Sequence, residues 1–366
     1  MSEGPIDSDR IADYPHPRET AELVGHELAE RTIIETFASG RLAHAWLFAG
    51  PPGIGKATLA YRMARFLLRH GDQVPKDHKA GLNVDPNDPV ARRIAAMSHG
   101  NLLVLRRPWD SARKRLKTVL TVDEVRRINN FFGLSASEGG WRVCIIDPAD
   151  DMNAAAGNAL LKTLEEPPAK SILIVISHAP GRLLATIRSR CRRLNLTPPS
   201  EEQARHIVAR CDPTLTAKQI GGLVNLAQNS PGRALALAQQ GGLDIYADLN
   251  ELLGQLPSLP DKALMSLSER LAKGSDDGPF SIALDLLSEW LRRMVEGGAT
   301  GIAHGEAVDN EQTVMNNVVK LAPLDRWVTA WEEVGALQKK ADALNLDRKQ
   351  TILQAFYKIQ KTCTAA

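Results

Sequence analysis

The chain has 366 residues, of which 43% are hydrophobic and 24% are charged, and its formal net charge is +2. A chain of this length exceeds one ordinary hydrophobic core, so we expect two or three domains in a globular protein. The near-neutral charge argues against a protein that binds nucleic acid on its own, and no apolar run is long enough to span a membrane.

The N-terminal residues 1–17 are polar and lack the apolar core of a signal peptide, so we expect them to form a loose tail. The four cysteines, Cys144, Cys191, Cys211 and Cys363, lie far apart in the sequence. Their spacing suits neither a zinc site nor a disulfide framework. A reducing compartment, the cytoplasm, is therefore the expected location.

Strand and helix patterns alternate through the N-terminal half of the chain. Short apolar runs that end in turns predict strands at 44–49, 102–105, 141–146 and 171–176. Helical periodicity predicts helices at 27–39, 59–68, 89–97, 121–132 and 153–166. Two polar stretches interrupt the pattern, a surface insertion at 71–88 and a basic connection at 106–117. This alternation implies an α/β fold with a mostly parallel sheet that helices cover on both faces.

The stretch Gly50-Pro-Pro-Gly-Ile-Gly-Lys-Ala-Thr58 lies between a predicted strand and a predicted helix. That context is typical of a phosphate-binding loop, because Gly50, Gly53 and Gly55 let successive N–H groups face an anion. The N-terminus of the following helix adds partial positive charge, and Lys56 would reach the outer phosphates. The loop is therefore predicted to bind the phosphates of a nucleotide.

This loop lacks the hydroxyl group that would hold Mg²⁺. The full pattern places Ser or Thr directly after the lysine, whereas this position is Ala57. Thr58 comes one residue late, and one residue on a helix turns a side chain by about 100°. We interpret the loop as part of a nucleotide-binding fold whose hydrolytic chemistry has degraded.

Asp147 follows the predicted strand at 141–146, where an ATPase with such a loop carries a metal-binding acid. A glutamate that activates water follows this acid in an active enzyme, but here the next residue is Pro148, which has no proton-accepting side chain. Neither Asp150 nor Asp151 obviously replaces it. The alternative is that Asp147 only ends a strand before a turn, and the loop upstream argues against that interpretation.

Two arginines are candidates for contacts with nucleotide phosphates. Arg190 lies in Ser189-Arg190-Cys191, and a guanidinium aimed at a neighbouring subunit's nucleotide would stabilise charge on the γ-phosphate. The alternative is that Arg190 is only one arginine of a basic surface, because several other arginines lie nearby in the sequence. Arg233, at a predicted helix start in Ser230-Pro-Gly-Arg233, is either a nucleotide sensor or a solvated helix residue.

The composition shifts after residue 196, and the rest of the chain is predicted to be helical. A capping box at Ser200–Gln203 starts a helix, and amphipathic runs follow, including 282–294 and 324–344. These patterns divide the chain into a tail at 1–17, a P-loop domain at 18–197, a small helical lid at 198–241 and an all-α domain at 242–366.

Over roughly residues 18–240, these landmarks in this order resemble the AAA+ clamp-loader family of bacterial DNA polymerase III. The resemblance rests on the stretches 44–56, 121–126, 141–147, 149–150, 152–153, 158–168, 187–191 and 230–233. The C-terminal third matches mainly in being helical. The resemblance implies an AAA+ domain with a parallel sheet, a helical lid, and a helical collar that joins subunits into a pentameric ring.

The resemblance also implies roles for residues and partners. The chain is similar to the stator subunit, which is expected to hydrolyse no ATP and to offer the arginine of its Ser-Arg-Cys motif, here Arg190, to an adjacent gamma/tau subunit. The implied partners are the gamma/tau and delta subunits, with the sliding clamp and primer-template DNA reached through the complex. Many relatives carry a zinc module after the loop helix, but residues 71–99 contain no cysteine, so no zinc is predicted.

No cofactor is predicted to be required, and weak binding of ATP or ADP without Mg²⁺-dependent hydrolysis stays open. The vestigial nucleotide site would consist of Gly50, Gly53, Gly55, Lys56, Thr58, Asp147 and Arg233. The alternative is an ATP-hydrolysing gamma/tau-like subunit or another AAA+ ATPase, against which Ala57 and Pro148 argue. A stand-alone DNA-binding protein is disfavoured by the net charge.

Overall fold

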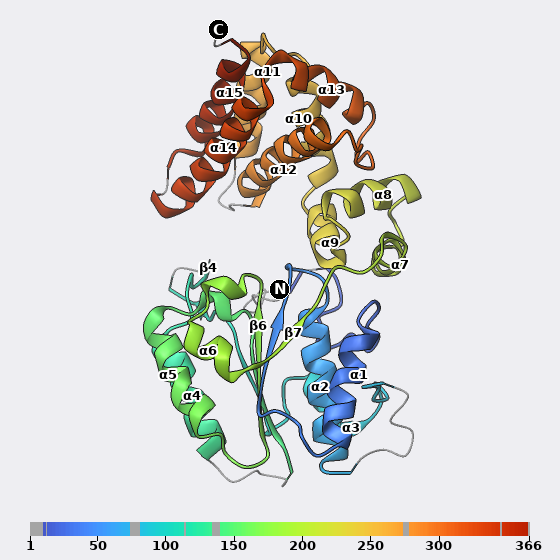
Figure 1. Ribbon diagram of the computed structural model, residues 1–366, viewed down its shortest axis with the longest axis vertical. Coiled ribbons are helices and arrows are strands. Elements are labelled where there is room, and N and C mark those ends of the chain that lie inside the picture. Colours follow the sequence, from blue (N-terminus) through green and yellow to red (C-terminus); the bar gives the residue numbers. More distant parts are fainter. Residues whose placement is uncertain are drawn as a thin grey trace. The chain divides into compact units, whose positions relative to one another are not determined.

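A computed structural model describes residues 10–11, 13–73, 81–112, 115–133, 140–273, 278–344 and 346–364. The chain forms two compact units (Figure 1). The first, which we call the sheet unit, comprises Met1–Ile207 and Ser230–Arg233. The second, the helical unit, comprises Val208–Asn229 and Ala234–Ala366. The finer division of the helical part into a lid at 198–241 and a collar at 242–366 stays a prediction.

The sheet unit is built on a five-stranded parallel sheet with the order β2-β5-β6-β1-β7. Its strands are β1 (Ala45–Ala49), β2 (Leu102–Leu105), β5 (Arg142–Ile146), β6 (Ser171–Ser177) and β7 (Arg192–Asn195). Every residue of β1 and β6 is buried, as parallel strands covered on both faces require. The predicted parallel sheet and its predicted strands are confirmed.

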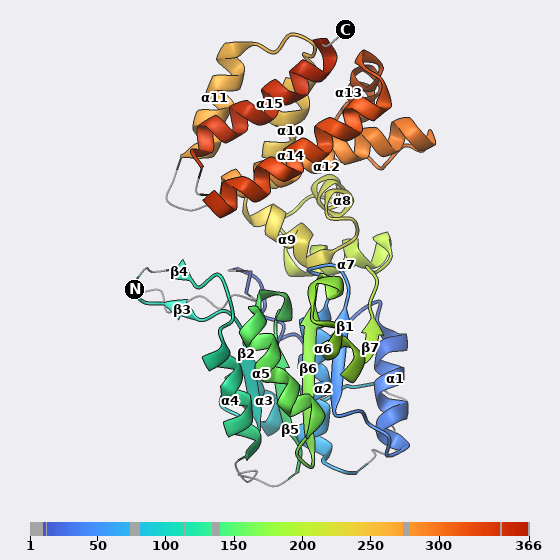
Figure 2. The same ribbon diagram turned by 60° about the vertical axis from the view of Figure 1, so that its left-hand side comes forward.

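Helices cover both faces of this sheet (Figure 2). They are α1 (Glu27–Ala38), α2 (Lys56–His70), α3 (Pro89–Ala95), α4 (Val122–Gly133), α5 (Ala154–Glu165) and α6 (Ala185–Arg190), with short 3₁₀ helices at Ala149–Asp151 and Pro180–Arg182. Trp46 and Phe48 of β1 pack with α1, α2 and α3, whereas Leu47 packs with α4, α5 and α6 on the other face. This alternation follows from the two-residue period of a strand.

The basic connection at 106–117 contains structure that the sequence pattern did not indicate. It includes the antiparallel pair β3 (Trp109–Asp110) and β4 (Arg115–Leu116). Strands of two residues are too short to show a period-two alternation of side chains, so the pattern carried no signal for them.

The helical unit contains the end of α7 (Glu201–Cys211) and the helices that follow. These are α8 (Ala217–Leu226), the part of α9 (Pro231–Gln239) from Ala234 on, α10 (Gly242–Leu253), α11 (Asp261–Ala272), α12 (Gly278–Thr300), α13 (Glu311–Val318), α14 (Leu324–Leu344) and α15 (Arg348–Thr364), with a 3₁₀ helix at Val319–Leu321. Trp290, Trp327 and Phe356 are fully buried between them. None of the helices in the described part of the chain is both long and apolar enough to cross a membrane.

An ion pair lies inside the helical unit. Arg293 Nε is 2.9 Å from Glu311 Oε1, and the two side chains are 3% and 1% exposed. The same carboxylate accepts hydrogen bonds from the Tyr246 hydroxyl at 2.7 Å and from the Ala307 N–H at 2.6 Å. Beside this carboxylate and away from water, the pKa of Tyr246 is raised well above its usual value. The carboxylate therefore ties together α10, α12 and the start of α13.

We expect Glu311→Gln to lower the free energy of unfolding by about 3–5 kcal/mol, because it leaves the charge of Arg293 buried without its partner. Denaturant titration of the full chain would measure the loss. Glu269→Gln is the matched control, because the Glu269 side chain is 58% exposed beside Lys349 and such a pair contributes at most about 1 kcal/mol. Equal losses in the two variants would contradict the stabilising role of the buried pair.

Candidate functional site

The carboxyl ends of the central strands place several of the predicted site residues at one edge of the sheet. In a parallel sheet these ends meet at the same edge, and β5, β6 and β1 are neighbours there. Gly50 follows β1, and Asp147 follows β5. Lys56 begins α2 and lies close enough to Asp147 and Asp150 for both carboxylates to act on its pKa. The structure therefore brings together the glycine-rich loop, its lysine and the acid.

The glycines of the loop are required by its geometry. Gly53 and Gly55 have φ angles of 76° and 104°, in the left-handed region that other residues rarely adopt. A Cβ atom on Gly53 would lie 2.6 Å from both the Arg233 nitrogen and Ser230 Oγ. The loop therefore has the backbone that a phosphate-binding turn needs, and another segment of the chain packs closely against it.

The side chain of Lys56 forms hydrogen bonds within its own loop. Its side chain is buried, and Nζ donates hydrogen bonds to the carbonyl oxygens of Gly50, at 2.6 Å, and of Pro51. Burial lowers the pKa of Lys56 to about 8, although Asp147 and Asp150 act in the opposite direction. A phosphate at this site would have to draw the lysine away from both carbonyl oxygens.

The segment Ser230–Arg233 covers the loop from outside. Ser230 Oγ donates to the Pro52 carbonyl at 2.7 Å, and the Gly232 N–H donates to the Gly53 carbonyl at 2.9 Å. The structure therefore places Arg233 beside the loop, where its side chain is half-buried rather than fully solvated. The role of Arg233 as a nucleotide sensor stays a prediction.

The acids that follow β5 are engaged with their own unit. Asp147 is 6% exposed. Asp150 accepts hydrogen bonds from Ser177 Oγ at 2.8 Å, from the His178 N–H at 2.6 Å and from the Ala179 N–H at 3.1 Å. Asp151 forms an ion pair with Arg107 at 3.1 Å. Asp150 and Asp151 thus hold neighbouring segments in place. We therefore do not expect either residue to act as the water-activating base that is missing at Pro148.

The residues at the two positions after Lys56 also differ from those of a metal-binding loop. Ala57 packs against the apolar core on the face of α1 and α2. Thr58 is half-buried in the first turn of α2. The hydroxyl group that would hold Mg²⁺ is therefore replaced by a methyl group that contacts the core.

Sequence reasoning missed the contacts that two residues make at this site. His26 Nε2 lies 2.6 Å from the Ile54 carbonyl, an acceptor, so this nitrogen carries the proton. Burial lowers the pKa of His26, which favours the neutral ring. The other residue is Asp150, whose partners follow β6. Both residues act through contacts that span more than twenty positions of sequence, so no local pattern reports them.

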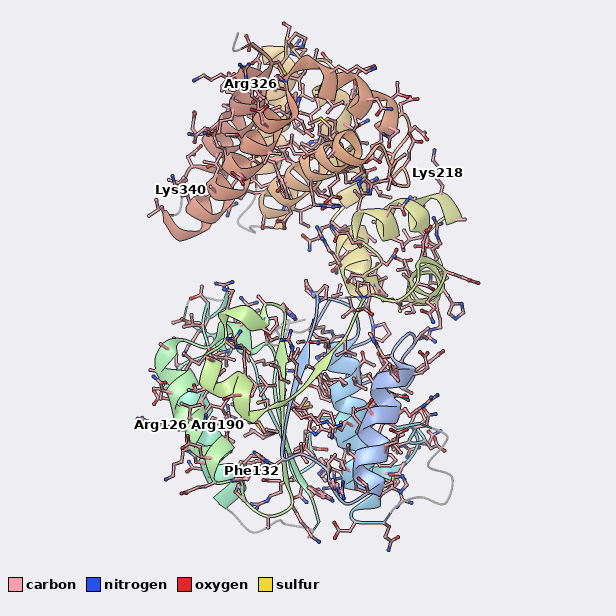
Figure 3. All side chains as sticks on the ribbon, viewed as in Figure 1. Arg126, Phe132, Arg190, Lys218, Arg326 and Lys340 are labelled. Carbon is pink, nitrogen blue, oxygen red and sulfur yellow. The ribbon has the colours of Figure 1, made fainter. Side chains whose placement is uncertain are left out.

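Arg190 lies at the opposite edge of the sheet from the loop. It ends α6, two residues before Arg192, which pairs with Trp46 near the start of β1. The loop begins after Ala49, three residues further along β1, which is about 10 Å of strand. Arg190 is exposed beside the end of α5 (Figure 3). It is therefore directed to the surface rather than to the nucleotide site of its own chain.

The guanidinium of Arg190 has two contacts within the chain. Nη2 is 2.8 Å from Glu165 Oε1, and Nη1 donates to the Thr186 carbonyl at 3.2 Å. Ser189 and Cys191, which flank Arg190 in the sequence, offer no charged group. Ser189 Oγ also donates to the Thr186 carbonyl, and Cys191 is buried, which raises the pKa of its thiol to about 12. Cys191 is a packing residue, so of the Ser-Arg-Cys motif only Arg190 carries a charge at the surface.

The described part of the insertion after α2 is held by polar contacts. Arg62 Nη2 donates to Asn83 Oδ1 at 2.7 Å, and Arg69 Nε lies 2.5 Å from Asp88 Oδ2. Leu82, next to Asn83, is buried in the hydrophobic core on the side of α1 and α2. Among the described residues, no group of at least three histidine, cysteine or acidic side chains is placed to bind a metal. Residues 74–80 of the insertion lie outside the described residues.

Comparison with known proteins gives consistent matches. A family model described as DNA polymerase III, delta subunit, matches residues 25–200. The chain is 35% identical to DNA polymerase III subunit delta′ of Escherichia coli over 207 residues, which cover 57% of this chain and 58% of the relative. It is 33% identical to subunit delta′ of Pseudomonas aeruginosa over 248 residues, covering 68% and 70%. It is also 27% identical to subunit tau of Bacillus subtilis over 294 residues, covering 76% and 47%.

The buried lysine predicts a dependence of stability on pH. Below pH 8 Lys56 is charged in both states, so the cost of burying it is fully present. Between pH 8 and 10.5 the folded state releases the proton first, so the free energy of unfolding should rise by up to about 3 kcal/mol relative to Lys56→Met. Denaturant titrations of wild type and variant across this range measure the difference. Lys340→Met, at an exposed position, is the control that should show no such trend.

We expect a strong chelator to leave the melting temperature unchanged, because the described part of the insertion is held by the Arg62 and Arg69 contacts. A structural zinc ion contributes about 10 kcal/mol or more to folding, and its removal would be conspicuous. Calorimetry with and without chelator, beside a metal analysis of the purified protein, tests this. Stoichiometric zinc, together with a chelator-dependent loss of stability, would contradict it.

Proposed function

Because this chain belongs to the family of DNA polymerase III subunit delta′, we propose that it is a non-hydrolysing subunit of a clamp loader. In this role it assists the ATP-dependent loading of a sliding clamp onto primed DNA and supplies an arginine finger to a neighbouring ATPase subunit. Its AAA+ P-loop fold then serves as a scaffold rather than as a motor.

The observation that carries the proposal is the placement of Arg190. An arginine finger must reach the γ-phosphate of a bound nucleotide. Parallel register separates Arg190 from the loop of its own chain by the length of β1 and leaves the guanidinium exposed. A phosphate that meets this guanidinium would therefore belong to another subunit, which in this proposal is gamma/tau.

The state of the chain's own nucleotide site supports the same role. Ala57 replaces the metal-binding hydroxyl, Pro148 replaces the base, and Lys56 is bonded to loop carbonyls. Rapid hydrolysis needs Mg²⁺ and an oriented water, and these residues supply neither. The glycines and Lys56 remain compatible with weak binding of ATP or ADP.

The proposed partners follow from the same assignment. The gamma/tau and delta subunits would join this chain in a pentameric ring through the helical unit. The sliding clamp and the primer-template DNA would be reached through that complex. The net charge of +2 suits a subunit that does not bind DNA by itself.

The second candidate is an ATP-hydrolysing gamma/tau-like subunit. It is favoured by the retained Lys56 and by the 27% identity with B. subtilis tau. Under this alternative Arg190 would be a solvated surface residue, and the ATPase activity of the isolated chain would depend on Lys56.

We expect Arg190→Ala to lower the steady-state ATPase rate of a reconstituted clamp loader, assayed with clamp and primed DNA. The reduction should reach about 10³-fold at the site that Arg190 serves, and less for the whole complex if several sites are active. Lys56→Ala should change the rate little, and the isolated chain should be inactive. Arg188→Ala, at another exposed position of α6, is the matched control.

Hydrolysis by the isolated chain that disappears in Lys56→Ala would replace the proposed role with that of a motor. Equal effects of the Arg190 and Arg188 substitutions would instead show that this edge of the sheet acts only through its general positive charge.

A further inference from the structure

The ion pair between Arg190 and Glu165 assigns a role to an acidic residue outside the nucleotide site. We propose that Glu165 is a positioning residue that orients the Arg190 guanidinium toward the nucleotide of a neighbouring subunit. This inference rests on the proposed function of Arg190 in trans. Glu165 itself touches no phosphate in this proposal.

The backbone on either side of Arg190 is fixed by the core. Ile187 is 1% exposed, and Cys191 is 8% exposed, so both anchor the chain next to Arg190. Helix α6 also packs closely on α5, because a Cβ atom on Gly157 would lie only 3.1 Å from the Leu184 side chain. Packing against the core therefore holds the Cα atom of Arg190 in place beside α5, and its exposed side chain is what remains to be oriented.

Glu165 is the last residue of α5, at the point where α5 comes beside the end of α6. Its carboxylate holds Nη2 of Arg190, and the Thr186 carbonyl holds Nη1. Two acceptors on the two terminal nitrogens fix the plane of the guanidinium. A guanidinium has five N–H donors, so the donors that these two contacts do not use can face an incoming phosphate in a set direction.

A side chain that is already oriented loses less conformational entropy when it binds a phosphate. The contact is not expected to stabilise the fold, because the Arg190 and Glu165 side chains are 37% and 51% exposed and exposed ion pairs contribute little. A function in turnover and a function in stability are therefore separable by experiment.

The test compares Glu165→Ala, Glu165→Gln, Arg190→Ala and the double variant Glu165→Ala/Arg190→Ala in the reconstituted clamp loader with clamp and primed DNA. We expect Glu165→Ala to lower kcat for ATP about tenfold at the site that Arg190 serves, with little change in KM and a smaller effect than Arg190→Ala in the whole complex, since a misplaced group slows the chemical step. Glu165→Gln keeps an acceptor oxygen and should retain most of the activity. Melting temperatures of the isolated variants should equal that of wild type.

The double variant is the decisive measurement. If Glu165 acts through Arg190, then Glu165→Ala should have no further effect once Arg190 is alanine. Glu166→Ala, at the adjacent exposed position, is the matched control and should match wild type.

Three results would overturn the proposal: an unchanged kcat in Glu165→Ala, an equal loss with and without Arg190, or a fall in melting temperature that accounts for the loss. Its failure is distinguishable from that of the proposed function. If Arg190→Ala lowers turnover and Glu165→Ala does not, only the positioning role fails. If Arg190→Ala itself has no effect, the function in trans fails, and the role of Glu165 fails with it.

Discussion

The parallel pairing of β1 with β6 on one side and with β7 on the other is the constraint on which the site depends. Because β1 is central, the loop after Ala49 lies at the carboxyl edge of the sheet, within reach of the groups that follow β5 and β6. The same register fixes the start of β7 beside the start of β1. One strand therefore determines both where a nucleotide would lie and why Arg190 cannot reach it.

The carbonyl groups of the glycine-rich loop are satisfied by contacts within the chain. Lys56 bonds to the carbonyls of Gly50 and Pro51, and Ser230 and Gly232 bond to the next two carbonyls of the loop. Buried polar groups that are paired cost little, whereas unpaired ones are costly. The loop carbonyls of residues 50–53 are therefore all satisfied by donors of the chain itself.

Much of this arrangement could be predicted from local patterns. The apolar runs located β1, β2, β5 and β6, and helical periodicity located α5, which Asn153 caps by accepting a hydrogen bond from the Ala156 N–H at 2.9 Å. The glycines, Lys56 and Asp147 were grouped in one predicted site because Asp147 follows a strand downstream of the loop, where such ATPases carry a metal-binding acid. The Glu165–Arg190 contact and the hydrogen bonds of Asp150 could not be predicted, because they join residues that are distant in sequence and show no periodicity. The sequence pattern also did not reveal that Arg190 and the loop lie at opposite edges, which only the register establishes.

The segment Ser230–Arg233 belongs to the sheet unit although the residues on both sides of it belong to the helical unit. The chain thus passes from one unit to the other at 207–208, at 229–230 and at 233–234. No single cut separates two self-contained pieces. A fragment that ends at Ile207 would leave the carbonyls of Pro52 and Gly53 without their donors, so a loop studied in such a truncated fragment would not be the loop of the intact chain.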